Sequence, residues 1–219
     1  YFVTDGGGGN GVFMQMERAG MSPSDVTDLF ISHSHTDHLI GAIWLVRVIG
    51  HQFDRDGRTT PLHVYGHASV LETFRTICGL LVSGQVMSHF DKDIIFHAVE
   101  SGETHAIGHW QVTFFDTGAA KTTQYGWRAE LENGKSLVFL GDEPLTDTDL
   151  PFAKDADYLI HEAMCLEAEA DKYHPHRIHH SSVVDAANNA TKAGAKTLIL
   201  FHSEDTGLDT RKARYTAEA

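Results

Sequence analysis

The sequence predicts a mixed α/β chain in which two β-sheets are covered by helices. Short β-like segments follow one another as a meander in the middle of the chain, and helices alternate with strands in the C-terminal third. The chain has 219 residues, of which 42% are hydrophobic, and this is enough for one sizeable core. We therefore expect a single domain over residues 1–219.

The N-terminal stretch begins with a strand pattern at residues 1–5. Because the sequence opens on a strand and without Met, we expect one or more N-terminal strands to be missing from it. A glycine-rich loop follows at residues 6–11, and a helical pattern at residues 12–19 ends near Gly20. The loop lacks the Lys-Ser/Thr of a P-loop and the glycine spacing of a dinucleotide fingerprint, so a nucleotide-binding loop is not expected.

The next segments alternate between strand and helix patterns. Residues 28–32 form a short apolar run typical of a buried strand, and residues 39–49 predict an apolar helix. Residues 62–66 predict another strand, and residues 69–81 have helical periodicity.

The middle of the chain favours antiparallel strands. Residues 94–99 and 110–115 are rich in β-branched and aromatic side chains. Residues 125–131 and 136–140 flank the dipeptide Asn-Gly at positions 133–134. This pattern predicts a hairpin with a tight turn.

The C-terminal third alternates between strand and helix. Residues 158–161 predict a strand, and Ser181 or Ser182 is expected to cap a helix that Gly194 ends. The last two expected elements are a buried strand at residues 197–201 and a helix at residues 209–217.

Charge limits the classes of partner. Thirty acidic residues against seventeen Lys and Arg give a net charge of −13, and no dense basic stretch occurs. Because nucleic acids are bound through Lys and Arg contacts to phosphate, a long nucleic acid is not expected as a partner. A small anion can still bind beside metal ions, whose charge dominates locally. We therefore expect an anionic small-molecule substrate.

Cysteine usage and hydropathy bear on location. Cys78 and Cys165 are not in a C-x-x-C pair, so neither a zinc knuckle nor a disulfide framework is expected. Such usage suits a reducing cytoplasm. The longest apolar runs are too short to span a bilayer, so no membrane segment is expected.

The sixteen histidines are unusually many, and six consecutive residues show what some of them do. His33, His35, Asp37 and His38 stand within the run His-Ser-His-Thr-Asp-His, directly after an expected buried strand. In extended backbone, residues two apart point the same way, so the first two histidines can bind one cation together. Asp37 and His38, at the start of a helix, point to a neighbouring position. Imidazole is a common metal ligand, and the spacing predicts a metal site.

Two further residues fit such a site. Asp142 follows Gly141 at the end of an expected strand, where its carboxylate could bridge two metal ions. His202 ends the strand expected at residues 197–201. Alone, each would be interpreted as a turn aspartate or as a histidine at the edge of the core. The histidine-rich run at residues 33–38 changes that interpretation and favours metal-ligand roles for both residues.

Together these motifs resemble the metallo-β-lactamase superfamily, on the H-x-H-x-D-H run at 33–38 and the Gly-Asp at 141–142. Residues 159–163, 180–182 and 198–202 resemble the HEAT, HST and final-His motifs of its ribonuclease Z branch. The resemblance implies a four-layer αββα sandwich with the site at one edge of the two sheets. It also implies one or two zinc ions, with iron or manganese in some relatives, and a possible homodimer.

The resemblance also assigns roles to residues of this chain. It puts His33, His35 and Asp142 on metal one, and Asp37, His38, Asp142 and His202 around metal two. His180 matches the catalytic histidine of the branch, and Glu162 matches the acidic residue of its HEAT motif.

One departure from the family stands in the segment before the hairpin, which contains no histidine. The superfamily supplies a further ligand to metal one from this region, and we place the missing histidine at Gly118. Asp116, water or a histidine of residues 174–180 could substitute for it. A degenerate protein that binds metal without turnover is the alternative that this departure leaves open.

The predicted function is that of a metal-dependent hydrolase that uses a metal-activated water. Asp37 would orient the water, and His180, its ring fixed by Glu162, would protonate the leaving oxygen. The ribonuclease Z resemblance favours a phosphodiester, and the acidic charge favours a small or nucleotide-like one. Hydrolysis of a carboxyl ester, lactone or thioester on the same scaffold is the other enzyme alternative.

Overall fold

The computed structural model describes residues 1–204 and 206–219. These residues divide into two compact units, Tyr1–Glu100 (unit 1) and Ser101–Ala219 (unit 2). Each unit carries its own sheet. The mixed α/β class with two sheets is therefore confirmed, whereas one domain over the whole length stays a prediction.

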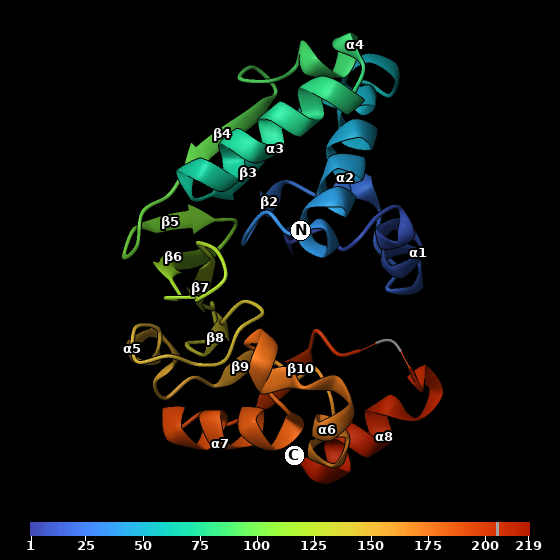
Figure 1. The fold of residues 1–219 in the computed structure, drawn as a ribbon. Coiled ribbons are helices and arrows are strands. Elements are labelled where there is room, and N and C mark those ends of the chain that lie inside the picture. Colours follow the sequence, from blue (N-terminus) through green and yellow to red (C-terminus); the bar gives the residue numbers. More distant parts are fainter. Residues whose placement is uncertain (205) are drawn as a thin grey trace. The chain divides into compact units, whose positions relative to one another are not determined.

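Unit 1 contains a sheet in the order β1-β2-β3-β4, in which all neighbouring strands are parallel (Figure 1). Its strands are β1 (Phe2–Thr4), β2 (Asp28–Phe30), β3 (Leu62–Gly66) and β4 (Ile94–Ala98). Its helices are α1 (Gly11–Arg18), α2 (Thr36–Arg55), α3 (Ala68–Leu81), α4 (Gly84–Met87) and the short 3-10 helix η1 (Pro23–Asp25).

The core of unit 1 lies between its sheet and the helices α2 and α3. Leu29 of β2 and Val64 of β3 are paired in the sheet, and both belong to one buried cluster with Leu45 of α2 and Phe74 of α3. Because side chains alternate across a strand, these positions place one face of the sheet against the helices. The short strands predicted at residues 28–32 and 62–66 are both present.

The glycine-rich loop packs on helix α2 backbone to backbone. The Gly6 amide donates to the carbonyl of His38 at 2.8 Å, and the Gly41 amide donates to the carbonyl of Gly7 at 2.7 Å. A Cβ at Gly6 would lie 1.8 Å from the backbone nitrogen of Ala42. Only glycine permits this approach, so the loop is fixed to the first turns of α2.

Unit 2 contains a sheet in the order β10-β9-β8-β7-β6-β5. From β5 to β8 the neighbouring strands are antiparallel, and β8, β9 and β10 are parallel. The strands are β5 (Thr104–Ile107), β6 (Trp110–Asp116), β7 (Tyr125–Glu130), β8 (Ser136–Phe139), β9 (Tyr158–Glu162) and β10 (Leu198–Phe201). The predicted hairpin is the pair β7 and β8.

The helices of unit 2 lie mainly beside its parallel strands. They are α5 (Leu150–Ala153), α6 (Ala170–Tyr173), α7 (Val183–Ala193) and α8 (Leu208–Glu218), with 3-10 helices η2 (Glu167–Glu169) and η3 (Pro175–Ile178). Helix α7 packs against β9 and β10, and α8 packs against α7 (Figure 1). Ser182 and Asp185 form a capping box at the start of α7, and Gly194 ends it with φ +71°.

Several elements differ from expectation, among them the short helices α4, α5 and α6, which were not predicted. Strand β5 was not predicted, because its sequence Thr-His-Ala-Ile is short and gains its pairing only from β6. Helix α2 is longer than the predicted 39–49, since its polar first turn and its last turn continue the helix beyond the apolar run. Asp37 and His38 therefore stand on the helix itself.

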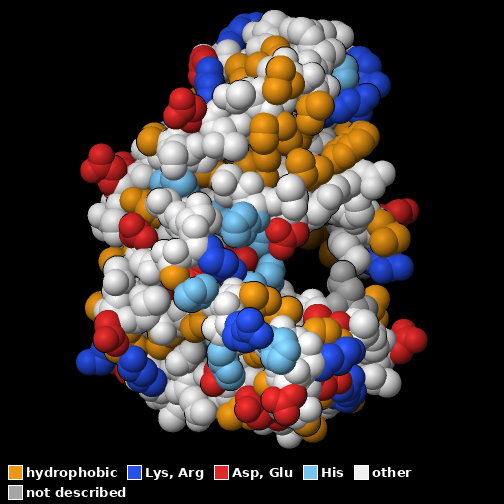
Figure 2. Space-filling model, in the orientation of Figure 1, with side chains coloured by type: hydrophobic (Ala, Val, Ile, Leu, Met, Phe, Trp, Pro, Cys, Tyr) orange, Lys and Arg blue, Asp and Glu red, His pale blue; other side chains and the backbone are white. Residues whose placement is uncertain are grey.

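The surface mixes charge with apolar patches. On the face that Figure 2 shows, acidic and basic side chains are interspersed, and apolar side chains gather over the region of α2 and α3. The exposed apolar side chains of those helices include Trp44, Leu80 and Leu81. Among the described residues, no helix combines the length and hydropathy needed to cross a bilayer.

Candidate metal centre

Unit 1 contributes the histidine-rich run between β2 and α2. His35, the N-cap of α2, has extended backbone at φ −66° and ψ 151°, so the side chains of His33 and His35 lie on the same side of the chain. Their rings meet edge to face with centroids 4.5 Å apart. His33 Nε2 lies 2.9 Å from His35 Nδ1.

This pair of nitrogens fits one metal ion. Zinc–nitrogen bonds of about 2.0–2.1 Å at tetrahedral angles separate two ligand nitrogens by about 3.3 Å. His33 Nδ1 lies 3.0 Å from Ser32 Oγ, whose hydroxyl is 2.7 Å from Asp5 Oδ2. Because the serine hydroxyl donates to the carboxylate, it accepts the Nδ1–H of His33. The lone pair of His33 is then on Nε2, the atom beside His35.

Asp5 supports the second pair of the run. Its Oδ2 accepts a hydrogen bond from His38 Nδ1 at 2.8 Å, and its Oδ1 accepts from the Ser32 amide at 2.8 Å. A carboxylate on Nδ1 directs the lone pair of His38 to Nε2, which lies 3.5 Å from Asp37 Oδ2. The His38 side chain is 4% exposed and that of Asp37 is 57% exposed, so the carboxylate reaches outward.

Asp5 was not among the predicted site residues. It directly follows β1, whose pairing with β2 brings the ends of these two strands together. A carboxylate immediately after a strand was the available signal, but only the pairing of β1 with β2 connects it to Ser32 and His38.

Unit 2 brings together three potential ligands. Asp142 follows β8, and His202 follows β10 with an unusual left-handed φ of 52°. His202 Nε2 lies 3.7 Å from Asp142 Oδ2. The ring of His180 stacks on that of His202 with centroids 5.3 Å apart. One ligand atom each of Asp142, His180 and His202 lies within 4.8 Å of the other two.

Gln124 holds Asp142 from two directions. Its side-chain amide donates to Asp142 Oδ1, and its Oε1 accepts the Asp142 amide at 3.2 Å. Both residues are buried. A Cβ at Gly141, which has φ +83°, would lie 2.3 Å from Gln124 Oε1, so glycine leaves room for this contact. Gln124 was not predicted as a site residue, because a whole hairpin separates it from Asp142 in the sequence.

Glu162 and His180 form a second pair in unit 2. Glu162 ends β9, is fully buried and accepts the Ser181 amide through Oε1. Its Oε2 lies 3.4 Å from His180 Nδ1. The carboxylate therefore fixes the segment that carries His180 and faces one ring nitrogen. The other ring nitrogen, Nε2, lies 3.1 Å from Lys121 Nζ.

His161 has a structural role within unit 2. Its Nδ1 donates to the carbonyl of Glu162 at 2.6 Å, and its Nε2 lies 3.1 Å from Asn189 Nδ2. Burial lowers the pKa of His161 below its ordinary value, which keeps the ring neutral. The residue joins β9 to α7 and supports the position of the neighbouring Glu162.

The structure argues against Gly118 as the position of the missing ligand. Its φ is +69°, and an added Cβ would lie 2.9 Å from Thr148 Oγ1 and 3.1 Å from Thr148 Cβ. A side chain there would point at Thr148. Asp116, one of the suggested substitutes, accepts the Gly118 amide at 2.8 Å. Of the histidines at residues 174–180, His180 is the one grouped with Asp142 and His202.

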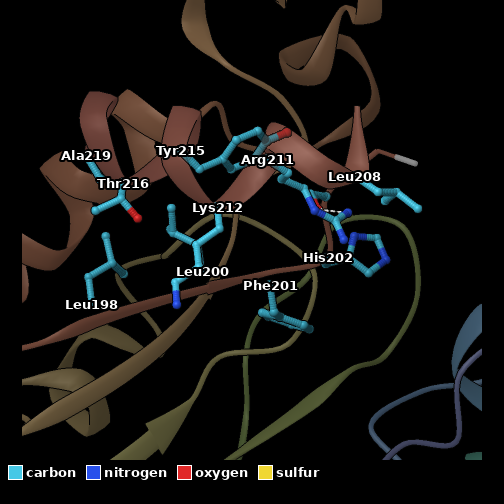
Figure 3. A pocket seen from close by; sticks show the side chains of 11 residues that line it. Leu198, Leu200, Phe201, His202, Leu208, Arg211, Lys212, Tyr215, Thr216 and Ala219 are labelled. Atoms are coloured by element: carbon cyan, nitrogen blue, oxygen red, sulfur yellow. Dashed lines mark hydrogen bonds between the residues drawn. The ribbon is translucent and has the colours of Figure 1, made fainter. Parts of the chain in front are cut away.

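A pocket of about 680 Å³ adjoins His202 in unit 2. Figure 3 shows it between β10 and α8, with Leu200 and Phe201 on one side and Arg211 and Tyr215 on the other. Arg211 donates to Ser203 Oγ at 2.5 Å. The lining combines apolar side chains with two cationic ones, Arg211 and Lys212.

Comparison with known proteins gives a consistent result. A family model described as the beta-lactamase superfamily domain matches residues 3–203. The chain is 30% identical to the ribonuclease Z of Thermococcus onnurineus over 245 residues, which cover 89% of this chain and 73% of that protein. It is 28% identical to the ribonuclease Z of Gemmatimonas aurantiaca over 240 residues, which cover 89% of this chain and 74% of that protein.

Solved structures also resemble the chain. The short form of human tRNase Z has a TM-score of 0.69 and 23% identity, covering 92% of this chain and 81% of that one. The metallo-beta-lactamase fold protein YhfI from Bacillus subtilis has a TM-score of 0.68 and 21% identity, covering 98% of this chain and 79% of that one.

Proposed function

This chain belongs to the metallo-β-lactamase superfamily, on its ribonuclease Z branch, and from this premise we propose that it hydrolyses a small, nucleotide-like phosphodiester. The metallo-β-lactamase fold is the predicted one and is confirmed. The enzyme class, a metal-dependent phosphodiester hydrolase, is also the predicted one. Similarity to ribonucleases Z supports it over hydrolysis of a carboxyl ester, lactone or thioester.

The metal ligands that we propose are those of the family pattern. They are His33, His35, Asp37 and His38 from unit 1, and Asp142 and His202 from unit 2. Imidazole nitrogens and carboxylate oxygens are the ligands of catalytic zinc sites, and the orientation of the His33 ring by Ser32 and of the His38 ring by Asp5 supports the assignment. We propose zinc, as one or two ions.

The chain's own residues would carry out the remaining chemistry. Zinc, when bound, lowers the pKa of a water molecule and stabilises charge at the phosphorus. Asp37 would orient the attacking water, whose oxygen bonds to phosphorus as the ester P–O bond breaks. His180 would give a proton to the leaving oxygen, with its ring held by Glu162 at 3.4 Å. The grouping of His180 with Asp142 and His202, with Glu162 facing the other side of the His180 ring, is the observation that carries this proposal.

The size of the substrate follows from charge. The chain has a net charge of −13, which opposes the approach of a long polyanion. The pocket beside His202, which combines apolar side chains with Arg211 and Lys212, offers room for the base or other organic group of a small diester. We therefore propose a small nucleotide-like ester as the substrate. Cleavage of a long RNA would refute this part of the proposal.

Location and assembly belong to the same proposal. Cys78 and Cys165 are buried, unpaired thiols, which suits a reducing cytoplasm. A homodimer is compatible with the family. Sedimentation of the purified chain would establish the number of copies.

The test combines metal analysis with three substrates. Protein purified without chelator should contain one or two zinc ions per chain and hydrolyse bis(p-nitrophenyl) phosphate faster than a p-nitrophenyl carboxyl ester or a thioester. His33→Ala and His202→Ala, one from each unit, should both lower zinc content and turnover. His109 is an exposed histidine, and His109→Ala is the matched control, which should change neither zinc content nor turnover. Zinc binding without turnover of any of the three substrates would favour the degenerate protein instead.

A further inference from the structure

We propose that Lys121 binds the phosphate group of the substrate and thereby selects anionic esters, an inference that rests on the proposed function. The residue stands on the loop between β6 and β7. Its Nζ lies 3.1 Å from Nε2 of His180 and 4.0 Å from Oε1 of Glu143.

The loop that carries Lys121 is fixed by a buried carboxylate. Glu143, which directly follows Asp142, accepts the Ala120 amide at 2.7 Å and the Lys121 amide at 3.1 Å. The Glu143 side chain is only 6% exposed. Both backbone bonds involve a charged acceptor, so they are stronger than ordinary amide bonds. The backbone of Lys121 is therefore held to the residue next to a proposed metal ligand.

The ammonium group itself is placed to receive an anion. The side chain of Lys121 is 25% exposed, so it remains accessible to a small solute. An ammonium has three donors. The ammonium makes a close contact with His180, and its contact with Glu143 is at the distance limit of an ion pair. Donor capacity is left for a ligand.

The chemistry of the surroundings makes phosphate the fitting ligand. Lys121 Nζ donates to His180 Nε2, and an oxygen of a phosphodiester can accept from the remaining N–H groups of the ammonium. Asp142, Glu143 and Glu162 place three carboxylates in this part of unit 2, and the Lys121 ammonium offsets part of their repulsion of a negative substrate. A neutral ester would gain no comparable interaction. Lys121 should therefore affect anionic substrates more than neutral ones.

Inorganic phosphate is the probe for binding, and it requires no turnover. Zinc-loaded wild type, Lys121→Met, Lys121→Arg and Lys154→Met would be titrated with phosphate by calorimetry after equal zinc content is verified. Lys154 stands on the surface of the same unit and is the matched control. We expect Lys121→Met to weaken phosphate binding by about 10- to 100-fold, the usual effect of losing a hydrogen bond to a charged group. Lys121→Arg should retain most of the affinity, and Lys154→Met all of it.

Kinetics provides the second readout. For bis(p-nitrophenyl) phosphate, Lys121→Met should raise KM by about tenfold or more with a smaller fall in kcat, because the lost contact is made to the bound substrate. Lys121→Gln serves the same purpose if Lys121→Met does not fold. A wild-type affinity for phosphate in the neutral variants, or no phosphate binding by the wild type, would overturn the inference. Phosphate binding that depends on Lys121 in a protein without phosphodiesterase activity would keep it and refute the proposed function instead.

Discussion

The side chain of Gln124 contacts both the backbone and the carboxylate of Asp142. Its Oε1 accepts the Asp142 amide at 3.2 Å while its amide group donates to Asp142 Oδ1. These bonds reinforce each other's geometry, because the first fixes which way the glutamine amide is turned. The orientation of a proposed metal ligand thus depends on a residue eighteen positions earlier in the chain.

Gln124→Leu should weaken zinc binding by about 10- to 100-fold, the usual cost of removing a residue that orients a metal ligand. The leucine fills a similar volume but cannot donate to Asp142, so the carboxylate loses its fixed direction. Competition with a chromophoric zinc chelator measures the effect. Gln111→Leu, at an exposed position of β6, is the control and should bind zinc like the wild type. Equal affinity in Gln124→Leu would show that the amide does not orient the ligand.

Asp5→Asn should also weaken zinc binding by about 10- to 100-fold. Asp5 has φ 56°, a left-handed conformation that asparagine also adopts readily, so this substitution preserves the backbone while removing the charge. The amide no longer fixes the Nδ1 proton of His38. Zinc affinity and thermal unfolding should be measured together, with the exposed Asp56→Asn as control. A loss of stability without a loss of zinc affinity would contradict the assigned role.

Gly118→Ala should destabilise the fold more than Gly134→Ala. Both glycines have a left-handed φ, +69° and +73°, so both substitutions carry the same backbone penalty of about 1 kcal/mol. Only at Gly118 does the new Cβ meet a neighbour, Thr148, at 2.9 Å, whereas nothing lies within 4 Å at Gly134. Overpacking typically adds about 1–3 kcal/mol. Urea denaturation would measure both, and equal losses would show that Thr148 moves aside without cost.

Gly118→His should not restore a metal ligand. The side chain would start toward Thr148, so we expect neither zinc content nor turnover to rise. Elemental analysis and the phosphodiester assay provide the measurement. A rise in both would reinstate Gly118 as the position of the missing histidine, against the backbone geometry.

The stability of unit 1 should depend on pH through His89. Its ring lies 2.6 Å from Asp93 and 3.0 Å from Asp54. Burial lowers the pKa of His89, but the hydrogen bonds and charges of these two carboxylates raise it further, so the net pKa lies above the ordinary 6.5. The contribution of the charged ring is therefore fully present below about pH 6.5 and is lost as pH rises through the folded pKa.

His89→Gln tests this dependence. The substitution should reduce the free energy of unfolding more at pH 5.5 than at pH 9, because only the protonated ring binds both carboxylates as a cation. His109→Gln, at an exposed position, is a suitable comparison. An equal loss at both values would mean that the ring is neutral in the folded protein.

The local parts of the fold and site were predictable from sequence. The run at residues 33–38 gives its chemistry by spacing alone, because extended backbone aligns His33 with His35 and the helix start presents Asp37 and His38. The end of α7 at Gly194 is equally local. Such features depend on neighbours in the chain, which a single sequence displays directly.

The parts that sequence missed depend on pairing between distant segments. Asp5 reaches Ser32 only because β1 and β2 are neighbours, and Gln124 reaches Asp142 only because β7 pairs with β8. Gly118 was assigned by its place in the chain, whereas its direction is set by a left-handed backbone beside Thr148. Strand pairing and the sign of the φ angle at a glycine are set by the tertiary structure, and the hydrophobic periodicity of the sequence does not encode them.

The contact between Gly6 and helix α2 has a consequence for how unit 1 tolerates change. Main-chain atoms alone set the separation of the two segments, so the spacing between Asp5 and His38 does not depend on which apolar side chains fill the interior. Core substitutions such as leucine for isoleucine could therefore accumulate during evolution without changing the position of the His38 imidazole. In contrast, a single methyl group at Gly6 or Gly41 would force the loop and helix α2 apart and misalign the His38 ring. Glycine at these two positions therefore fixes the metal-binding geometry.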